Sequence, residues 1–317
     1  MTLFIGHSSA LRLFRSLEKP ESLRPTQANP LSKGVPHLPE KPKCNSALTM
    51  LPAPLDVVVA SEKDRSQSKQ FSNHIWQLPD KVSSFLFLDK GIYLSTPEFC
   101  FAQLARECNA IELMKLGFEL CGTYRLDRKS PIGFRNAQPL TSPGAITRFL
   151  EKLPSRTPTA ANTALKFIRA DSASPMETCL ALLLGLPTRY GGYGLGVPTM
   201  NSETFISTRQ GKRVTHNRYH CDLFWPEQRV AVEYNSREFH INEQAIERDA
   251  SRINDLKAAG IEVVAVTRAH VANPDTFDAV AHTVARLLRK RVRTSCADVN
   301  ARRVELRRQL FAKDSWS

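Results

Sequence analysis

Apolar and polar positions along the chain predict two folded modules that follow a proline-rich start. Residues 1–55 hold eight prolines among Ser, Lys and Asn, with few apolar residues, so we expect this basic arm to be disordered. Residues 85–95 predict two short strands joined by a Lys-Gly turn, and apolar residues then recur at helical spacing. The section 56–170 is therefore predicted to be a small α-rich module with a β-hairpin.

The second module, residues 174–292, shows the order helix, strand, strand, strand, helix, strand, helix. We place its first strand at 194–200 and a polar loop at 202–213. The stretches 230–234 and 261–266 are apolar nearly throughout, which is typical of strands covered on both faces. This pattern predicts an α/β domain with a central mixed sheet flanked by helices.

Charge and composition narrow the class of partner. The chain has 317 residues, a formal charge of +13 and a pI of about 9.6. This charge favours a polyanion such as DNA, although a merely basic protein would show it too. The tail 293–317 is basic, as expected of a solvated helix face or of a segment that contacts phosphates.

The cysteine and hydropathy patterns bear on the compartment. The seven cysteines form no CxxC pair and their number is odd, which argues against a disulfide framework and a structural zinc site and favours a reducing cytoplasm. No apolar run approaches the roughly 20 residues that cross a bilayer, so we expect no membrane association.

Two acids on neighbouring predicted strands carry the candidate chemistry. A tight connection at 226–228 makes these strands antiparallel, and alternation puts Glu233 and Asn235 on one face. Asp222 should lie opposite Val232 or Glu233, but a slip of one residue would move it to the other face. Close carboxylates repel unless a cation lies between them, so the pair predicts a Mg²⁺ or Mn²⁺ site. The other interpretation is two strand-end acids with salt-bridge partners.

Further polar residues have two interpretations each. Glu177 follows Ser174 by three residues and could close a capping box or supply a third acidic ligand. Asp249 and Arg252 share a helical stripe, where Arg252 could reach a phosphate or pair with Glu233, and Asp249 could hold it in place. An exposed ion pair explains both equally well. His240 could act as a general base or hold a water, or it could be an uncommitted loop histidine.

One family shows these residue types in this order. The matching residues here are Glu177, Asp222, Glu233, His240, Asp249, Arg252, Leu256 and Gly260. The set resembles the PD-(D/E)XK nuclease superfamily over about 174–290, with most likeness to the branch related to very-short-patch-repair endonucleases. The resemblance implies a restriction-endonuclease-like fold with Asp222 and Glu233 as the metal pair.

The chain departs from this family at one catalytic position. Asn235 stands where the superfamily has a lysine, and asparagine can hold a water but carries no charge to stabilise a developing anion. Lys257 or Arg252 could supply that charge, or the fold could bind nucleic acid without cleaving it. The preceding module, 56–170, is similar to the abortive-infection antitoxin family, whose members bind DNA.

The leading hypothesis is an endonuclease-like Mg²⁺- or Mn²⁺-dependent phosphodiester hydrolase that acts on DNA in the cytoplasm. Glu177 would help to position the metal, and Asn235 and His240 would orient the attacking water. Asp249, Arg252 and Lys257 would face the nucleic acid. A decayed nuclease fold that serves as a DNA-binding or regulatory module in bacterial defence is the second hypothesis, and a protein-interaction scaffold is the third. A homodimer and a defence-system partner are left open.

Overall fold

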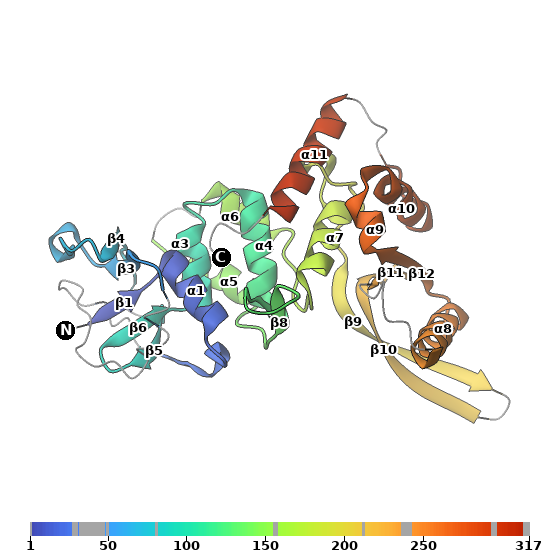
Figure 1. The fold of residues 1–317 in the computed structure, drawn as a ribbon, viewed down its shortest axis with the longest axis horizontal. Coiled ribbons are helices and arrows are strands. Elements are labelled where there is room, and N and C mark those ends of the chain that lie inside the picture. The colour runs from blue at the N-terminus through green and yellow to red at the C-terminus, as the bar shows by residue number, and fades with distance from the viewer. Residues whose placement is uncertain are drawn as a thin grey trace. The chain divides into compact units, whose positions relative to one another are not determined.

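The computed structural model describes residues 2–26, 31, 48, 51–79, 82–154, 158–210, 213–235, 243–292 and 297–312. The chain divides into an N-terminal unit that ends at Ile168 and a C-terminal unit, Arg169–Ala312 (Figure 1). Each unit has its own mixed sheet and its own flanking helices. No helix among the described residues is long and apolar enough to span a membrane.

The N-terminal unit is built on a six-stranded mixed sheet with the order β2-β5-β6-β1-β3-β4. Its strands are β1 (Leu3–Ile5), β2 (Arg24–Pro25), β3 (Leu55–Val59), β4 (Phe71–Ile75), β5 (Phe85–Asp89), β6 (Ile92–Ser95), and a separate pair β7 (Tyr124–Leu126) and β8 (Phe134–Asn136). Its helices are α1 (His7–Ser16), α3 (Pro97–Leu104), α4 (Ala110–Cys121), α5 (Pro143–Glu151) and α6 (Thr159–Leu165), with short 3₁₀ turns at Pro20–Ser22 and Glu62–Asp64.

The prediction of a disordered arm over 1–55 is wrong at its start. β1 lies between β6 and β3 in the sheet, and Leu3 and Ile5 are fully buried. α1 buries Leu11 and Phe14. The prolines begin only at Pro20, so the average composition of the arm concealed an apolar strand and an amphipathic helix. Residues 27–30 and 32–47 lie outside the described residues.

The α-rich description of residues 56–170 is also incomplete. The hairpin β5–β6 is confirmed, since the two strands pair antiparallel across residues 90–91. It is one part of a larger sheet, however, because β1 pairs parallel with β6 and β3 pairs parallel with β4. β4 reads FSNHI, and its polar residues gave no apolar alternation from which a strand could be predicted.

The C-terminal unit contains a four-stranded mixed sheet with the order β12-β11-β10-β9. Its elements are α7 (Pro175–Gly185), a 3₁₀ turn (Thr188–Tyr190), β9 (Thr199–Gln210), β10 (Arg213–Trp225), β11 (Val230–Asn235), α8 (Glu243–Ala258), β12 (Glu262–Thr267), α9 (Arg268–Ala272), α10 (Pro274–Leu287) and α11 (Ala297–Phe311). The predicted order of helices and strands is confirmed through β12 and α10, and the short helix α9 between those two was not predicted. The fold class, a mixed sheet flanked by helices, is confirmed at this level.

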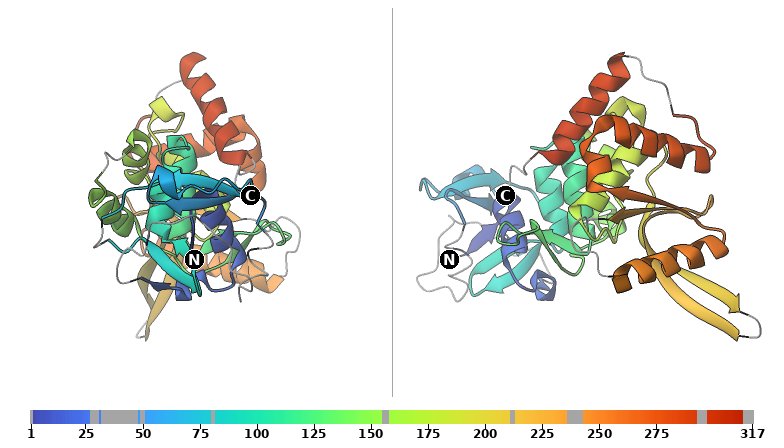
Figure 2. Two further views of the ribbon diagram at one scale, coloured as in Figure 1. Left: turned by 90° about the vertical axis from the view of Figure 1, so that its left-hand side faces the viewer. Right: turned by 45° about the vertical axis from the view of Figure 1, so that its right-hand side comes forward.

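The first strand of this unit differs from the prediction. β9 runs through Gln210, where a polar loop was expected at 202–213, and pairs with β10 along almost its whole length. Only Leu223–Trp225 of β10 also pair with β11. The rest of the hairpin forms a long two-stranded ribbon with α8 beside it (Figure 2). Threonine and serine dominate this stretch of β9, so no apolar alternation marked the strand.

The described part of the basic tail forms a helix, as one of its two interpretations requires, but the helix is packed as well as solvated. Residues 297–311 form α11, which contacts α7 and buries Leu306 and Leu310. Some of its arginines follow the solvated-face interpretation, because Arg308 pairs with Glu305 on the helix surface. Arg303 instead lies over the ring of Tyr193, 4.2 Å from its centroid. α11 is therefore an integral helix of the C-terminal unit rather than a tail.

Candidate functional site

Asp222 and Glu233 are opposite each other in the central hairpin of the C-terminal unit. β10 and β11 pair antiparallel with Leu223 opposite Val232, and the next step of this register brings Asp222 opposite Glu233. Directly opposed side chains of antiparallel strands extend from the same face. The backbone N–H of Tyr234 donates to Asp222 Oδ2 at 2.8 Å. The register thus removes the one-residue ambiguity that the sequence left.

Arg252 from α8 neutralises Glu233. Its Nη2 lies 2.9 Å from each carboxylate oxygen of Glu233, and it also donates to the carbonyl oxygen of His220. The Glu233 side chain is only 10% exposed, whereas that of Arg252 is 31% exposed. Of the two interpretations of Arg252, the pairing with Glu233 is the one present in this structure.

Hydrophobic packing and one glycine position α8 against the sheet. Leu256 is fully buried and joins Cys221, Ala231 and Ile261 in one apolar cluster. Gly260 ends the turn after α8 with φ of 75°, a left-handed conformation that favours glycine. The face of α8 that carries Arg252 is therefore held over β10 and β11.

Glu177 lies in the first turn of α7 and also bonds to the sheet. Ser174 Oγ accepts from the Glu177 backbone N–H at 3.2 Å and donates to its Oε1 at 2.9 Å, so Ser174 caps the helix as predicted, but the Glu177 carboxylate bonds the Ser174 hydroxyl instead of the Ser174 backbone N–H that a capping box requires. Oε2 accepts from the Ala173 N–H at 2.9 Å and from Asn201 Nδ2 at 2.7 Å. Glu177 is buried, with 8% exposure. Its hydrogen bond from Asn201 of β9 connects the start of α7 to the sheet.

Asn201 is a site residue that sequence reasoning missed. It lies on β9 between Met200 and Ser202, whose partners on β10 are Leu223 and Cys221, so it stands opposite Asp222. Its φ of 44° is left-handed, a conformation that asparagine tolerates better than most residues. The sequence offered no signal, since an asparagine in a polar stretch usually indicates a loop.

The charge of Asp222 affects the pKa values of both Glu177 and Glu233. Burial and the charge of Asp222 raise the pKa of Glu177, although its hydrogen bonds act in the opposite direction. Burial and Asp222 also raise the pKa of Glu233 to about 7, against the opposing effect of Arg252. Burial raises the pKa of Asp222 itself. Raised pKa values of this kind mean that full ionisation of the cluster is unfavourable without a further positive charge.

The carboxylates do not form a closely spaced ligand set in this structure. Among the described residues, three ligand atoms mutually within 4.8 Å occur at His7, His74 and Glu107 of the N-terminal unit and not here. Arg252 contacts both oxygens of Glu233, so a cation that shared Glu233 would compete with Arg252 for them.

The structure describes the side chains of two of the other predicted site residues and not those of the remaining two. Asn235 ends β11, is exposed and pairs with Thr267 of β12. Lys257 is exposed in the last turn of α8. Asp249 lies on α8, but its side chain is outside what the structure describes, as is all of His240. The predicted Asp249–Arg252 contact and the role of His240 stay predictions.

Comparison with known proteins gives no match to any family model, curated protein or solved structure.

Proposed function

We propose that the C-terminal unit is a Mg²⁺- or Mn²⁺-dependent phosphodiester hydrolase, endonuclease-like in fold and activity, that acts on DNA. The observation that carries this proposal is the strand register, which places Asp222 opposite Glu233 of β11 and opposite Asn201 of β9, whose amide donates to Glu177. The pKa values of all three acids are raised. Groups with such perturbed pKa values concentrate at functional sites. A divalent cation would offset the burial that raises all three pKa values and the repulsion from Asp222 that adds to it at Glu177 and Glu233.

The donor set suits this class of ion. Mg²⁺ and Mn²⁺ prefer hard oxygen ligands, and the candidate ligands Asp222, Glu233 and Glu177 are all carboxylates. When bound, such an ion supplies a water nucleophile and neutralises charge on the phosphodiester. Asp222 and Glu233 would hold the ion, and Glu177, whose carboxylate accepts from Asn201 Nδ2, would help to position it.

Arg252 would change partner during binding. Its guanidinium compensates the charge of Glu233, and a cation would take over that role. The released guanidinium is already 31% exposed and can bind a phosphate in a planar, two-point fashion. Asp249 would orient Arg252, Lys257 would bind the adjacent backbone, and Asn235 and His240 would hold the attacking water.

A plasmid-nicking assay tests the proposal. We expect the full chain to nick DNA with Mg²⁺ or Mn²⁺ and not with a chelator, and Asp222→Ala or Glu233→Ala to abolish nicking. Glu227→Ala, at an exposed acid in the β10–β11 turn, is the matched control and should cut normally. Circular dichroism verifies that each variant folds. Normal cutting by both site variants would refute the assignment.

A second candidate function follows from Arg252 and Asn235. Arg252 holds both oxygens of Glu233, and Asn235 stands at the position of the family's lysine. Both observations favour a decayed nuclease fold that binds DNA or regulates a bacterial defence system without cleavage. DNA affinity that is equal with metal and with chelator, together with no nicking, would support this function over the hydrolase.

A further inference from the structure

A strained turn in the N-terminal unit holds a buried histidine. β1 ends at Ile5 and α1 begins at His7, which has φ of 49° and is 3% exposed. A Cβ on Gly6 would lie 2.7 Å from Val58 Cγ2 and 2.8 Å from Gln103 Nε2, so only glycine fits before it. Gln103 Oε1 accepts from the His7 backbone N–H at 2.9 Å. Backbone strain held in place by packing in this way is common at functional sites.

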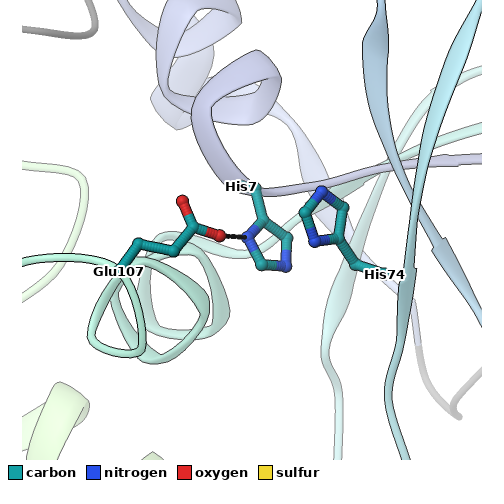
Figure 3. Close-up of side chains that lie close together, drawn as sticks. All are labelled: His7, His74 and Glu107. Atoms are coloured by element: carbon teal, nitrogen blue, oxygen red, sulfur yellow. Dashed lines mark hydrogen bonds and ion pairs between the residues drawn. The ribbon is translucent and has the colours of Figure 1, made fainter.

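Two other side chains meet His7. Its Nδ1 lies 2.6 Å from Oε1 of Glu107, in the turn that follows α3, and its ring stacks on His74 of β4 with centroids 3.6 Å apart. One ligand atom from each of the three residues lies within 4.8 Å of the others. Figure 3 shows the two imidazole rings side by side, with Glu107 directed at Nδ1 of His7 on the side away from His74. The three come from separate elements of the N-terminal unit.

The orientation of His74 is fixed from its far side. Its Nε2 lies 2.9 Å from Asp56 Oδ1. The other oxygen of Asp56 accepts from Ser8 Oγ at 2.6 Å and from the Ser9 N–H at 3.2 Å. An Nε2–H that donates to Asp56 leaves the lone pair of His74 on Nδ1, which has no hydrogen-bond partner among the described residues. A carboxylate that holds the outer nitrogen of a histidine is the usual support of a metal ligand.

We propose that His7, His74 and Glu107 bind a divalent transition-metal ion of the Zn²⁺ class, at a site separate from the one proposed in the C-terminal unit. Two imidazole nitrogens and one carboxylate oxygen suit Zn²⁺ and its neighbours, whereas Mg²⁺ and Ca²⁺ prefer oxygen ligands alone. The Glu107 side chain is 45% exposed and that of His74 is 23% exposed, so an ion can reach the site from solvent. Water would complete the coordination.

The hydrogen bonds of His7 predict what metal binding must change. Trp76 Nε1–H donates to His7 Nε2 at 3.2 Å, so the His7 proton resides on Nδ1 and is donated to Glu107. A neutral His7 that binds a metal through Nδ1 would carry its proton on Nε2. Two N–H groups would then face each other, and the hydrogen bond between Trp76 and His7 would be lost. Ligands at about 2.1 Å from a tetrahedral ion are about 3.4 Å apart, so the 2.6 Å contact between His7 and Glu107 must also open.

Zinc binding is measured on the full chain, stripped by chelator, by competition with a chromophoric chelator in excess Mg²⁺. We expect one tight Zn²⁺ per chain, weakened at least roughly tenfold in His74→Gln and in Glu107→Gln. His282→Gln is the matched control, because His282 also faces a carboxylate, Asp278 at 3.3 Å, but belongs to no cluster of three ligand atoms among the described residues. Its Zn²⁺ affinity should equal that of the wild type. Co²⁺ should show the ligand-field absorption of a nitrogen- and oxygen-bound ion.

Trp76 supplies an independent readout of the same site. In a chain with Trp225→Phe and Trp316→Phe, all tryptophan emission comes from Trp76. We expect Zn²⁺ to change this emission in the parent chain and not in its Glu107→Gln derivative, which removes a half-exposed ligand and should fold. No tight Zn²⁺ in the wild type, wild-type Zn²⁺ affinity in both ligand variants, or unchanged Trp76 emission at saturation would each overturn the proposal.

Discussion

The pH dependence of stability in the metal-free C-terminal unit gives the most quantitative check on its carboxylate cluster. Burial and Asp222 raise the pKa of Glu233 from 4.5 to about 7 in the folded protein. Between these values the folded state binds a proton that the unfolded state has lost, so the stability falls as pH rises. The contribution is fully present below pH 4.5 and lost above pH 7. At about 1.4 kcal/mol per pKa unit, the loss is roughly 3 kcal/mol.

Glu233→Gln should remove most of this dependence. Glutamine has the same shape but carries no titrating proton, and it also relieves the charge repulsion that Asp222 experiences. We expect the free energy of unfolding of the wild type to fall by roughly 3 kcal/mol from pH 4.5 to pH 8, with Asp222 and Glu177 adding to the fall because their pKa values are also raised. The variant should lose much less over the same range.

The assay is urea unfolding in the presence of a chelator. Trp225 is 6% exposed and lies in the C-terminal unit, so a chain with Trp76→Phe and Trp316→Phe reports on that unit alone. Glu262→Gln, at an exposed glutamate of β12, serves as the control and should keep the wild-type slope. The reasoning is refuted if Glu233→Gln retains the full slope, or if the wild type becomes more stable as pH rises.

Three further variants test neighbouring parts of the site. Arg252→Gln should raise Mn²⁺ affinity, measured by calorimetry, because it removes the group that competes for Glu233. It should also lower DNA cleavage in the nicking assay. A fall in Mn²⁺ affinity would show that Arg252 does not compete with the cation. Asn201→Ala should destabilise the C-terminal unit by about 1 kcal/mol through the lost hydrogen bond to Glu177, and urea unfolding that shows no change argues against that bond. Leu256→Ala should cost about 2–5 kcal/mol, since it leaves a cavity under α8; a smaller loss in thermal or urea unfolding would mean that α8 is not held by this contact.

The sequence predicted the parts of the fold that depend on strong local patterns. Ser174 and Pro175 mark the start of α7 by a side-chain cap and a proline in the first turn. Both signals involve only residues within four positions of one another in the sequence. The tight turn before Arg229 set the antiparallel pairing of β10 and β11. Such features are readable because the interactions that fix them are close in sequence.

The parts that the sequence did not predict depend on distant contacts. β1 is a strand because β3 and β6 flank it, and those strands come more than 45 residues later. Asn201 becomes a site residue only through the register between β9 and β10. The meeting of His7, His74 and Glu107 likewise depends on the sheet order, since no spacing pattern connects a histidine at a strand end with one 67 positions away.

Binding of Mn²⁺ tests the central claim most directly, namely that Asp222 and Glu233 share one cation. Electron paramagnetic resonance would follow the free ion during titration of a His74→Gln chain, in which the N-terminal cluster lacks a ligand. The account predicts one saturable Mn²⁺ site that is lost in Asp222→Ala and in Glu233→Ala and is kept in Glu262→Gln. Equal Mn²⁺ affinity in all four chains would contradict it.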